Sequence, residues 1–211
     1  MLTILNNRFS VLPNTCPVPS FEFRQTPNVS PSKSIVPSLI VIHYTASDSF
    51  SGTIAHCCSP ASKVSYHLII DRDGSVCQLA NFAQRAWHAG MGHWNGITDI
   101  NSHSVGIGLI NWGLLLPNAD GRMFAWPQQY TQPITSNHSY VARAHKHTPH
   151  KTQYWDTYPA AQLASLKYVV NLLVNEYPIY CAVGHDDVAP GRKVDPGPAC
   201  IQLPCSAFPF E

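Results

Sequence analysis

Proline and glycine are so frequent in residues 182–200, AVGHDDVAPGRKVDPGPAC, that this segment cannot form a continuous helix or a central strand. Residues 180–183, which overlap the start of this segment, form an apolar run that is short enough to be a buried strand. His185 would then emerge at the carboxyl end of that strand, where α/β sheets usually place ligands. The segment therefore predicts a shaped loop beside a functional end of a sheet.

A second strand of this kind ends on another histidine. Residues 39–42, LIVI, are apolar and mostly β-branched, and His43 follows directly. Together with the carboxylate of Asp195, His43 and His185 offer two nitrogen donors and one oxygen donor, which suit zinc and leave a fourth position for water. The spacing alone leaves an alternative open, because a strand-end histidine is often a hydrogen-bonded structural residue and His-x9-Asp matches no short zinc signature.

Four motifs in one order resemble the zinc-dependent N-acetylmuramoyl-L-alanine amidases. This family includes bacterial muropeptide amidases, phage T7 lysozyme and animal peptidoglycan recognition proteins. The resemblance covers roughly residues 36–200, and the motifs are IVIHYTA, VSYHLIIDRDGSVCQL with the later NSHSVGIGLIN, RAWHAG, and GHDDVAPGRKVDPGPA.

The resemblance implies one zinc ion per chain, held by His43, His185 and Asp195. It also implies hydrolysis of the amide bond between N-acetylmuramic acid and L-alanine in peptidoglycan or its muropeptide fragments. Lys193 matches the catalytic lysine of the family, and an ammonium there would stabilise the oxyanion. An ordinary surface lysine is the alternative.

The same resemblance suggests residues that bind substrate. It places Arg85 where the muropeptide amidases hold a carboxylate of the stem peptide, a role that suits a planar bidentate donor. Trp87, His88 and Asn101 are further substrate-binding candidates. The alternative is that Trp87 belongs to the core and that Arg85 is a solvated charge.

The sequence departs from the family at Gly108, in SVGIGL, where the muropeptide amidases carry a glutamate. Tyr66, in VSYH, matches a tyrosine of T7 lysozyme and the catalytic recognition proteins, which lack that glutamate. We therefore expect Tyr66 to supply the polar catalytic group, with a structural core tyrosine as the alternative. A site weakened by Gly108 is also consistent with the sequence.

Two other functions remain compatible with the motifs. One is a module that binds peptidoglycan without cutting it, as some family members do after losing a metal ligand. The other is a zinc peptidase that cuts within the stem peptide.

Length and composition favour one domain. The chain has 211 residues, of which 45% are hydrophobic and 12% charged, enough for one sizeable core. A net charge of +1 without a Lys and Arg run disfavours nucleic acid as a partner. No apolar stretch approaches the about 20 residues that span a bilayer, and no signal peptide is recognisable. We therefore expect synthesis as a soluble cytoplasmic protein, which could act on the envelope by another export route or after lysis. A monomer is favoured.

The predicted fold is a single α/β domain with a central mixed sheet, flanking helices and the zinc site at one edge of the sheet. Residues 1–35 are rich in Pro, Ser and Asn and predict an irregular arm, followed by the catalytic domain at 36–211. A hairpin is expected around the turn that ends on Gly74. A buried strand is expected at residues 104–110, where Gly106 and Gly108 have no side chain and so allow another backbone or a ligand to come close.

The remaining segments are less regular, apart from one helix. Apolar residues at steps of three and four predict a helix between Pro159 and Pro178. Residues 112–157 show little periodicity and are taken as an insertion, whose three histidines at 145, 147 and 150 suggest an exposed polar loop rather than a metal site. The chain has seven cysteines, so at least one stays free. For Cys57 and Cys58 we expect a surface loop or one structural disulfide.

Overall fold

The structure is a computed structural model that describes residues 2–11, 18–125, 133–134 and 138–200. Its strands are β1 (Leu2–Leu5), β2 (Arg8–Val11), β3 (Phe21–Phe23), β4 (Val29–Ser34), β5 (Leu39–Tyr44), β6 (Leu68–Ile70), β7 (Val76–Gln78), β8 (Gln84–Ala86), β9 (Ser104–Leu109), β10 (Leu114–Pro117), β11 (Met123–Ala125), β12 (Tyr140–His145), β13 (Thr148–Asp156) and β14 (Cys181–Gly184). The helices are α1 (Phe50–Cys58), a short 3-10 helix η1 (Ile100–Ser102), α2 (Ala160–Glu176) and α3 (His185–Val188).

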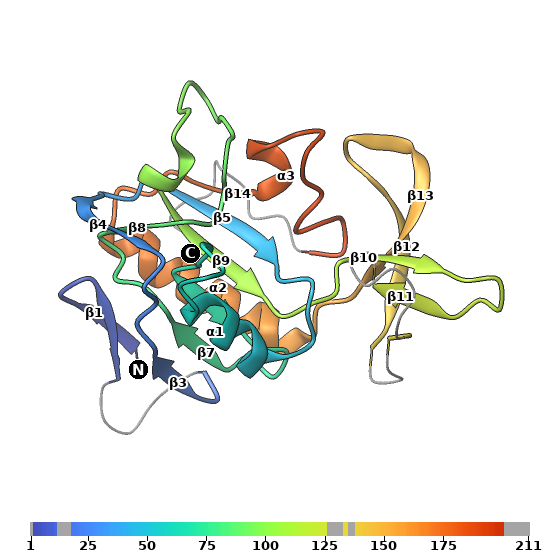
Figure 1. Ribbon diagram of the computed structural model, residues 1–211, viewed down its shortest axis with the longest axis horizontal. Coiled ribbons are helices and arrows are strands. Elements are labelled where there is room, and N and C mark those ends of the chain that lie inside the picture. Colours follow the sequence, from blue (N-terminus) through green and yellow to red (C-terminus); the bar gives the residue numbers. More distant parts are fainter. Residues whose placement is uncertain (1, 12–17, 126–132, 135–137, 201–211) are drawn as a thin grey trace.

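The central sheet has six strands in the order β14-β5-β9-β6-β7-β3 (Figure 1). β14, β5, β9 and β6 run parallel to one another, whereas β7 is antiparallel to β6, with the expected turn at Gly74 between them. The predicted mixed sheet is confirmed. Because β14 and β5 are adjacent and parallel, the two predicted strand-end histidines come out at the same end of the sheet.

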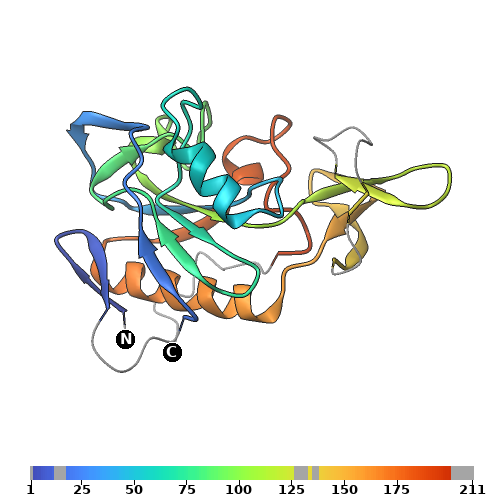
Figure 2. The ribbon, with the colours of Figure 1, turned by 60° about the horizontal axis from the view of Figure 1, so that its bottom comes forward.

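Helices cover both faces of this sheet, as Figure 2 shows for α1 and α2. Successive residues of a strand point to opposite faces. Leu68 and Ile70 accordingly pack with Leu166 and its neighbours on α2, while Ile69 packs with Ile54 on α1. The helix expected between Pro159 and Pro178 is confirmed as α2. Its core residues Leu166, Val169, Val170 and Leu173 are fully buried.

The first 35 residues were expected to be irregular, and this is wrong for the described part of them. β1 pairs with β2, β3 joins the central sheet beside β7, and β4 pairs with β8. The backbone N–H of Phe9 donates to Gln78 Oε1 at 2.8 Å, and its ring packs on Phe82. Local composition does not reveal β3 and β4, because their partners β7 and β8 lie far along the chain. The domain start at residue 36 stays a prediction.

Residues 112–157 contain a second sheet, of order β11-β10-β13-β12, which extends away from the central sheet beside α3 (Figure 1). The exposed polar loop expected around the three histidines is wrong for His145 and His150, which lie in strands, whereas His147 lies in an exposed turn between β12 and β13. His145 ends β12, is 2% exposed, and has Nε2 2.8 Å from Asp186 Oδ2. His150 is exposed on β13. These strands lack a clear period because several of their side chains are exposed on both faces.

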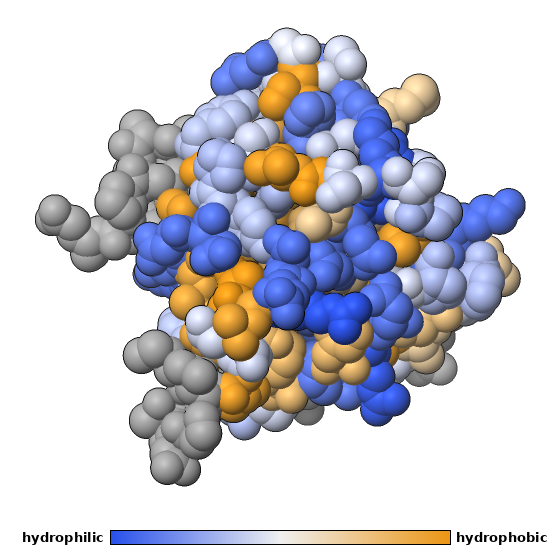
Figure 3. Space-filling model, turned by 90° about the vertical axis from the view of Figure 1, so that its left-hand side faces the viewer, coloured by the Kyte–Doolittle hydropathy of each residue, from blue (hydrophilic) through white to orange (hydrophobic). Residues whose placement is uncertain are grey.

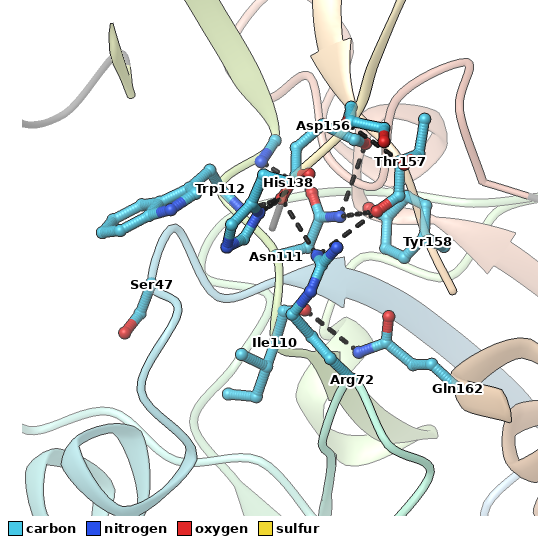
Figure 4. Close-up of polar contacts among 12 residues, drawn as sticks. Ser47, Arg72, Ile110, Asn111, Trp112, His138, Asp156, Thr157, Tyr158 and Gln162 are labelled. Carbon is cyan, nitrogen blue, oxygen red and sulfur yellow. Dashed lines mark hydrogen bonds and ion pairs between the residues drawn. The ribbon is translucent and has the colours of Figure 1, made fainter. Parts of the chain in front are cut away.

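The carboxylate of Asp156, the last residue of β13, is fully buried where the second sheet meets the central domain (Figure 4). Its Oδ2 accepts a hydrogen bond from Arg72 Nη1 at 3.2 Å and one from Trp112 N at 3.0 Å. His138 Nδ1 lies 3.0 Å from the same oxygen. Arg72 belongs to the turn between β6 and β7, so a buried ion pair joins the two parts of the chain.

Replacing Arg72 with methionine is expected to lower the free energy of unfolding by about 2 kcal/mol, because the buried carboxylate loses a charged partner. Urea denaturation measures this change. Arg122→Met is the matched control: its pair with Asp120 is exposed, and such pairs contribute about 0–1 kcal/mol. Equal effects of the two substitutions would contradict a stabilising role for the buried pair.

The cysteines also differ from expectation. Cys57 and Cys58 lie in α1 and are free thiols, so neither the surface loop nor a disulfide between or from them is found. Cys77 is also a free thiol, whereas Cys181 is disulfide-bonded. Cys16 and Cys205 lie outside the described residues.

Among the described residues, no helix combines the length and the apolar character needed to cross a membrane. Figure 3 shows the face of the molecule at the N-terminal strands, where apolar residues form separate patches among hydrophilic ones. Leu5 and Val11 are the exposed large apolar residues of β1 and β2.

Candidate active site

Three predicted ligands meet at one end of the central sheet. His43 lies near the end of β5, His185 begins α3 directly after β14, and Asp195 lies in the loop that follows. The Nδ1 atoms of the two imidazoles are 3.0 Å apart, and Asp195 Oδ2 is 2.9 Å from His43 Nδ1 and 3.0 Å from His185 Nδ1. All three residues are buried, and their donor atoms lie within 4.8 Å of one another.

The hydrogen bonds around these residues fit a metal ion. His185 Nε2 lies 2.9 Å from the carbonyl oxygen of Ala89, which can only accept, so Nε2 carries the proton. In the neutral ring Nδ1 then presents a lone pair toward His43 Nδ1 and the Asp195 carboxylate. Three lone-pair atoms at this spacing repel one another unless a cation lies among them. Two imidazole nitrogens and one carboxylate oxygen form a donor set suited to zinc.

The pKa shifts agree with this interpretation. Burial, followed by the neighbouring His185, lowers the pKa of His43 to about 4, so this imidazole is neutral at pH 7 and can act as a ligand. Burial alone would raise the pKa of Asp195, but hydrogen bonds from His185 and His43 hold it well below its usual range when these Nδ1 atoms carry protons, and a cation at the site would act in the same direction. Asp195 is therefore ionised.

A cavity of about 550 Å³ opens onto this site. The three ligands line it, and so do four more of the predicted site residues, namely Tyr66, Trp87, His88 and Lys193. Lys193 follows the turn at Gly191, and its backbone N–H donates to Ala189 O at 3.0 Å. The predicted catalytic residues and metal ligands thus share one cavity.

The Tyr66 ring lies against Gly108. Gly108 is paired with His43 in the sheet, and a Cβ built on Gly108 would lie 3.1 Å from the Tyr66 ring and 3.2 Å from Thr45 Cγ2. The ring centroids of Tyr66 and His43 are 5.2 Å apart. Burial, followed by Asp195, raises the pKa of Tyr66, so its hydroxyl keeps its proton. The ring occupies space that a side chain at position 108 would need.

Arg85 and Asn101 do not line the cavity. Arg85 Nη2 donates to Asp99 Oδ1 at 2.7 Å, Nε donates to Ser102 Oγ at 2.8 Å, and the guanidinium lies 4.0 Å from the centroid of the Trp87 ring. Asn101 is buried. Its Oδ1 accepts hydrogen bonds from the backbone N–H groups of His88 at 3.1 Å and Ala89 at 2.9 Å.

The cavity also includes residues that the sequence did not single out. Thr53 and His56 on α1 line it. The Ser49 side chain caps this helix by accepting from Gly52 N at 3.0 Å, a signal that the SDSFSGT sequence contains. Arg192 also lines the cavity and donates to the carbonyl oxygen of Ala89 at 2.8 Å.

Comparison with known proteins identifies the fold and the family. Residues 33–198 match the family model described as N-acetylmuramoyl-L-alanine amidase. The 1,6-anhydro-N-acetylmuramyl-L-alanine amidase AmpD of Haemophilus influenzae is 28% identical over 180 residues, 76% of each chain. AmpD of Escherichia coli is 30% identical over 152 residues, 71% of this chain but only 58% of that protein.

Solved structures agree. A crystal structure of an AmpD derivative has a TM-score of 0.55 at 26% identity, and the match covers 87% of this chain and 91% of that one. Escherichia coli AmiD, in complex with the substrate anhydro-N-acetylmuramic acid-L-Ala-D-gamma-Glu-L-Lys, shares the fold with a TM-score of 0.58 at 23% identity, covering 95% of this chain and 62% of that one. The match over residues 33–198 shows that this chain belongs to the N-acetylmuramoyl-L-alanine amidase family.

Proposed function

We propose that this chain is a zinc hydrolase that cleaves the amide bond between N-acetylmuramic acid and L-alanine in muropeptides. The convergence of His43, His185 and Asp195 at the cavity that Lys193 lines carries this proposal. The AmpD relatives are named as amidases of 1,6-anhydro-N-acetylmuramyl-L-alanine, and the AmiD structure contains an anhydromuropeptide substrate. A module that only binds peptidoglycan would not require a complete set of ligands.

His43, His185 and Asp195 would hold the zinc ion, which would supply a Lewis acid for the activation of water and of the amide carbonyl. Lys193 contributes an ammonium that stabilises the negative charge developing on the carbonyl oxygen. The fold supports this role, since Lys193 is two residues from Asp195 and lines the same cavity. Zinc itself and the role of Lys193 are therefore open to direct test.

Tyr66 is proposed to supply the polar group that a glutamate provides in other muropeptide amidases. Its hydroxyl would act as a hydrogen-bond donor and acceptor toward the reacting water or the developing oxyanion. The crowding between Tyr66 and position 108 supports an exchange of one residue for the other, because a side chain at 108 would press on the tyrosine ring.

Tyr66→Phe is expected to lower kcat by at least about tenfold, because the ring and its packing remain while the hydroxyl is lost. Zinc content and Tm should stay near the wild-type values. Steady-state hydrolysis of a muropeptide, with zinc measured by elemental analysis, checks this. An unchanged kcat would leave Tyr66 as a packing residue.

A double variant distinguishes two explanations of Gly108: that Tyr66 has replaced the glutamate, or that the missing glutamate weakens the site. Gly108→Glu alone should be inactive or unstable because its Cβ crowds Tyr66 and Thr45. Tyr66→Ser with Gly108→Glu removes the ring and restores a carboxylate beside His43, so it should recover activity relative to Tyr66→Ser. If Gly108→Glu alone exceeded the wild type, Gly108 would be a defect and the role of Tyr66 would be rejected.

The substrate-binding predictions are proposed in a revised form. Trp87 and His88 line the cavity, and Trp87, 37% exposed, is the better placed to contact a stem peptide. For Arg85 we propose that Nη1 binds a stem-peptide carboxylate while Nε and Nη2 remain bonded to Ser102 and Asp99. Asn101 would act on substrate only through the loop that it orients.

Incubating the zinc-loaded protein with an anhydromuropeptide and, separately, with polymeric cell wall tests the proposal. Products are identified by mass. Release of the sugar and an intact stem peptide supports the amidase, and the preferred substrate form defines the substrate class. No change would indicate a binding module, and a shortened peptide still attached to the sugar would indicate a peptidase.

A further inference from the structure

The imidazole of His88 lies between the ligand His43 and the central strand β9. Its Nδ1 is 3.1 Å from His43 Nε2, and its Nε2 is 3.3 Å from Ser104 Oγ. The Ser104 hydroxyl in turn donates to the carbonyl oxygen of Ile100 at 2.6 Å. A continuous chain of hydrogen bonds thus runs from a backbone carbonyl to the ring of a metal ligand.

The directions of these hydrogen bonds follow from the chemistry of each group. Ser104 has one proton and gives it to Ile100 O, so its oxygen can only accept from His88 Nε2–H. In the neutral ring His88 Nδ1 then carries a lone pair and accepts from His43 Nε2–H. His43 Nδ1 is left with its lone pair facing His185 and Asp195.

The same loop serves the second ligand histidine. The residue after His88, Ala89, accepts from His185 Nε2–H through its carbonyl oxygen. Asn101 holds both residues by accepting from their backbone N–H groups. One loop therefore provides the outer hydrogen-bond partner of each ligand histidine and selects the same tautomer in both.

A glycine on the neighbouring strand makes room for the His88 ring. A Cβ built on Gly106 would collide with His88 Cγ, Nδ1 and Cδ2, so only glycine at this position allows the ring to lie against β9. Most outer partners of metal-bound histidines are carboxylates, carbonyls or water. Here the outer partner of His43 is the imidazole of His88. Binding of substrate by His88 would not explain why its two nitrogens contact His43 and Ser104.

We propose that His88 is a positioning residue for the metal site, which holds His43 with Nδ1 available for the ion and is itself oriented by Ser104. This inference rests on the proposed function, because it requires that the site binds a metal. The predicted contact of His88 with substrate becomes secondary to this role.

Zinc affinity of the metal-stripped protein tests the inference without any measurement of activity. His88→Phe keeps a flat ring but removes the acceptor, and we expect zinc to bind about 10–100-fold more weakly in competition with a chromophoric chelator. His88→Gln has both an acceptor and a donor on its amide, and it should restore much of the affinity. The cobalt-substituted His88→Phe protein should also show an altered visible spectrum.

His103→Phe, at an exposed histidine before β9, is the matched control and should bind zinc like the wild type. Melting of the metal-free proteins verifies that each variant folds, and if both His88 variants fail to fold, Ser104→Ala carries the test with the same expected direction. Wild-type affinity and an unchanged cobalt spectrum in a folded His88→Phe, or in Ser104→Ala as its substitute, would overturn the inference alone. A wild-type protein that binds no zinc would overturn the proposed function as well.

Discussion

Replacing His185 with alanine is expected to remove most of the zinc from the purified protein and to abolish hydrolysis. The reason is that His185 supplies one of the three donor atoms that converge here, with Nδ1 3.0 Å from both His43 Nδ1 and Asp195 Oδ2. Two remaining ligands give a much weaker site, and hydrolysis depends on the ion. His43→Ala and Asp195→Ala should behave in the same way. Elemental analysis after extensive dialysis measures the zinc content.

His150→Ala is the control for these three variants, since His150 is exposed on β13. It should hold as much zinc as the wild type. Added zinc should raise the Tm of the wild type and of this control, but much less that of His185→Ala, because a ligand stabilises the folded state that binds it. Full zinc occupancy in His185→Ala would refute the ligand assignment.

Lys193→Ala is expected to keep zinc and fold but to lose about 100-fold or more in kcat, the usual effect of removing one electrostatic stabiliser of an oxyanion. KM should change less than kcat, because the charge that the ammonium stabilises develops mainly in the transition state. The measurement is steady-state hydrolysis at saturating muropeptide, with zinc content determined on the same sample.

Lys167→Ala on α2 provides the matched control, an exposed lysine on the helix that covers one face of the sheet. Its kcat should equal that of the wild type. If Lys193→Ala also retained wild-type kcat, Lys193 would be an ordinary surface charge and the stabilisation of the oxyanion would fall to other groups.

The sequence was sufficient for those parts of the fold and site that depend on local pattern. The apolar runs before His43 and Gly184 predicted two buried strands, and these are adjacent in the sheet, which brings His43 and His185 together. The period of three and four predicted α2 correctly. Comparing motifs linked the missing glutamate at Gly108 with the presence of Tyr66, and the Tyr66 ring lies next to Gly108.

The parts that were missed depend on partners distant in the chain. β3 pairs with β7, and β10 pairs with β13, across separations for which a local pattern gives no signal. For His88 the motif predicts only a position near the site. Only the three-dimensional contacts with His43 and Ser104 reveal the hydrogen-bond chain. The hydrogen bond between Arg85 and Asp99 likewise has no signal in the local sequence.

Hydrolysis in heavy-oxygen water tests the central claim most directly. Cleavage of the amide between the lactyl group of N-acetylmuramic acid and L-alanine transfers the water oxygen to the lactyl carboxylate and leaves the stem peptide with a free amine. Mass spectrometry should therefore find the heavy oxygen in the sugar product and none in the peptide, only with the zinc-loaded protein. Heavy oxygen in a peptide carboxylate, or no labelled product at all, would contradict the proposed amidase.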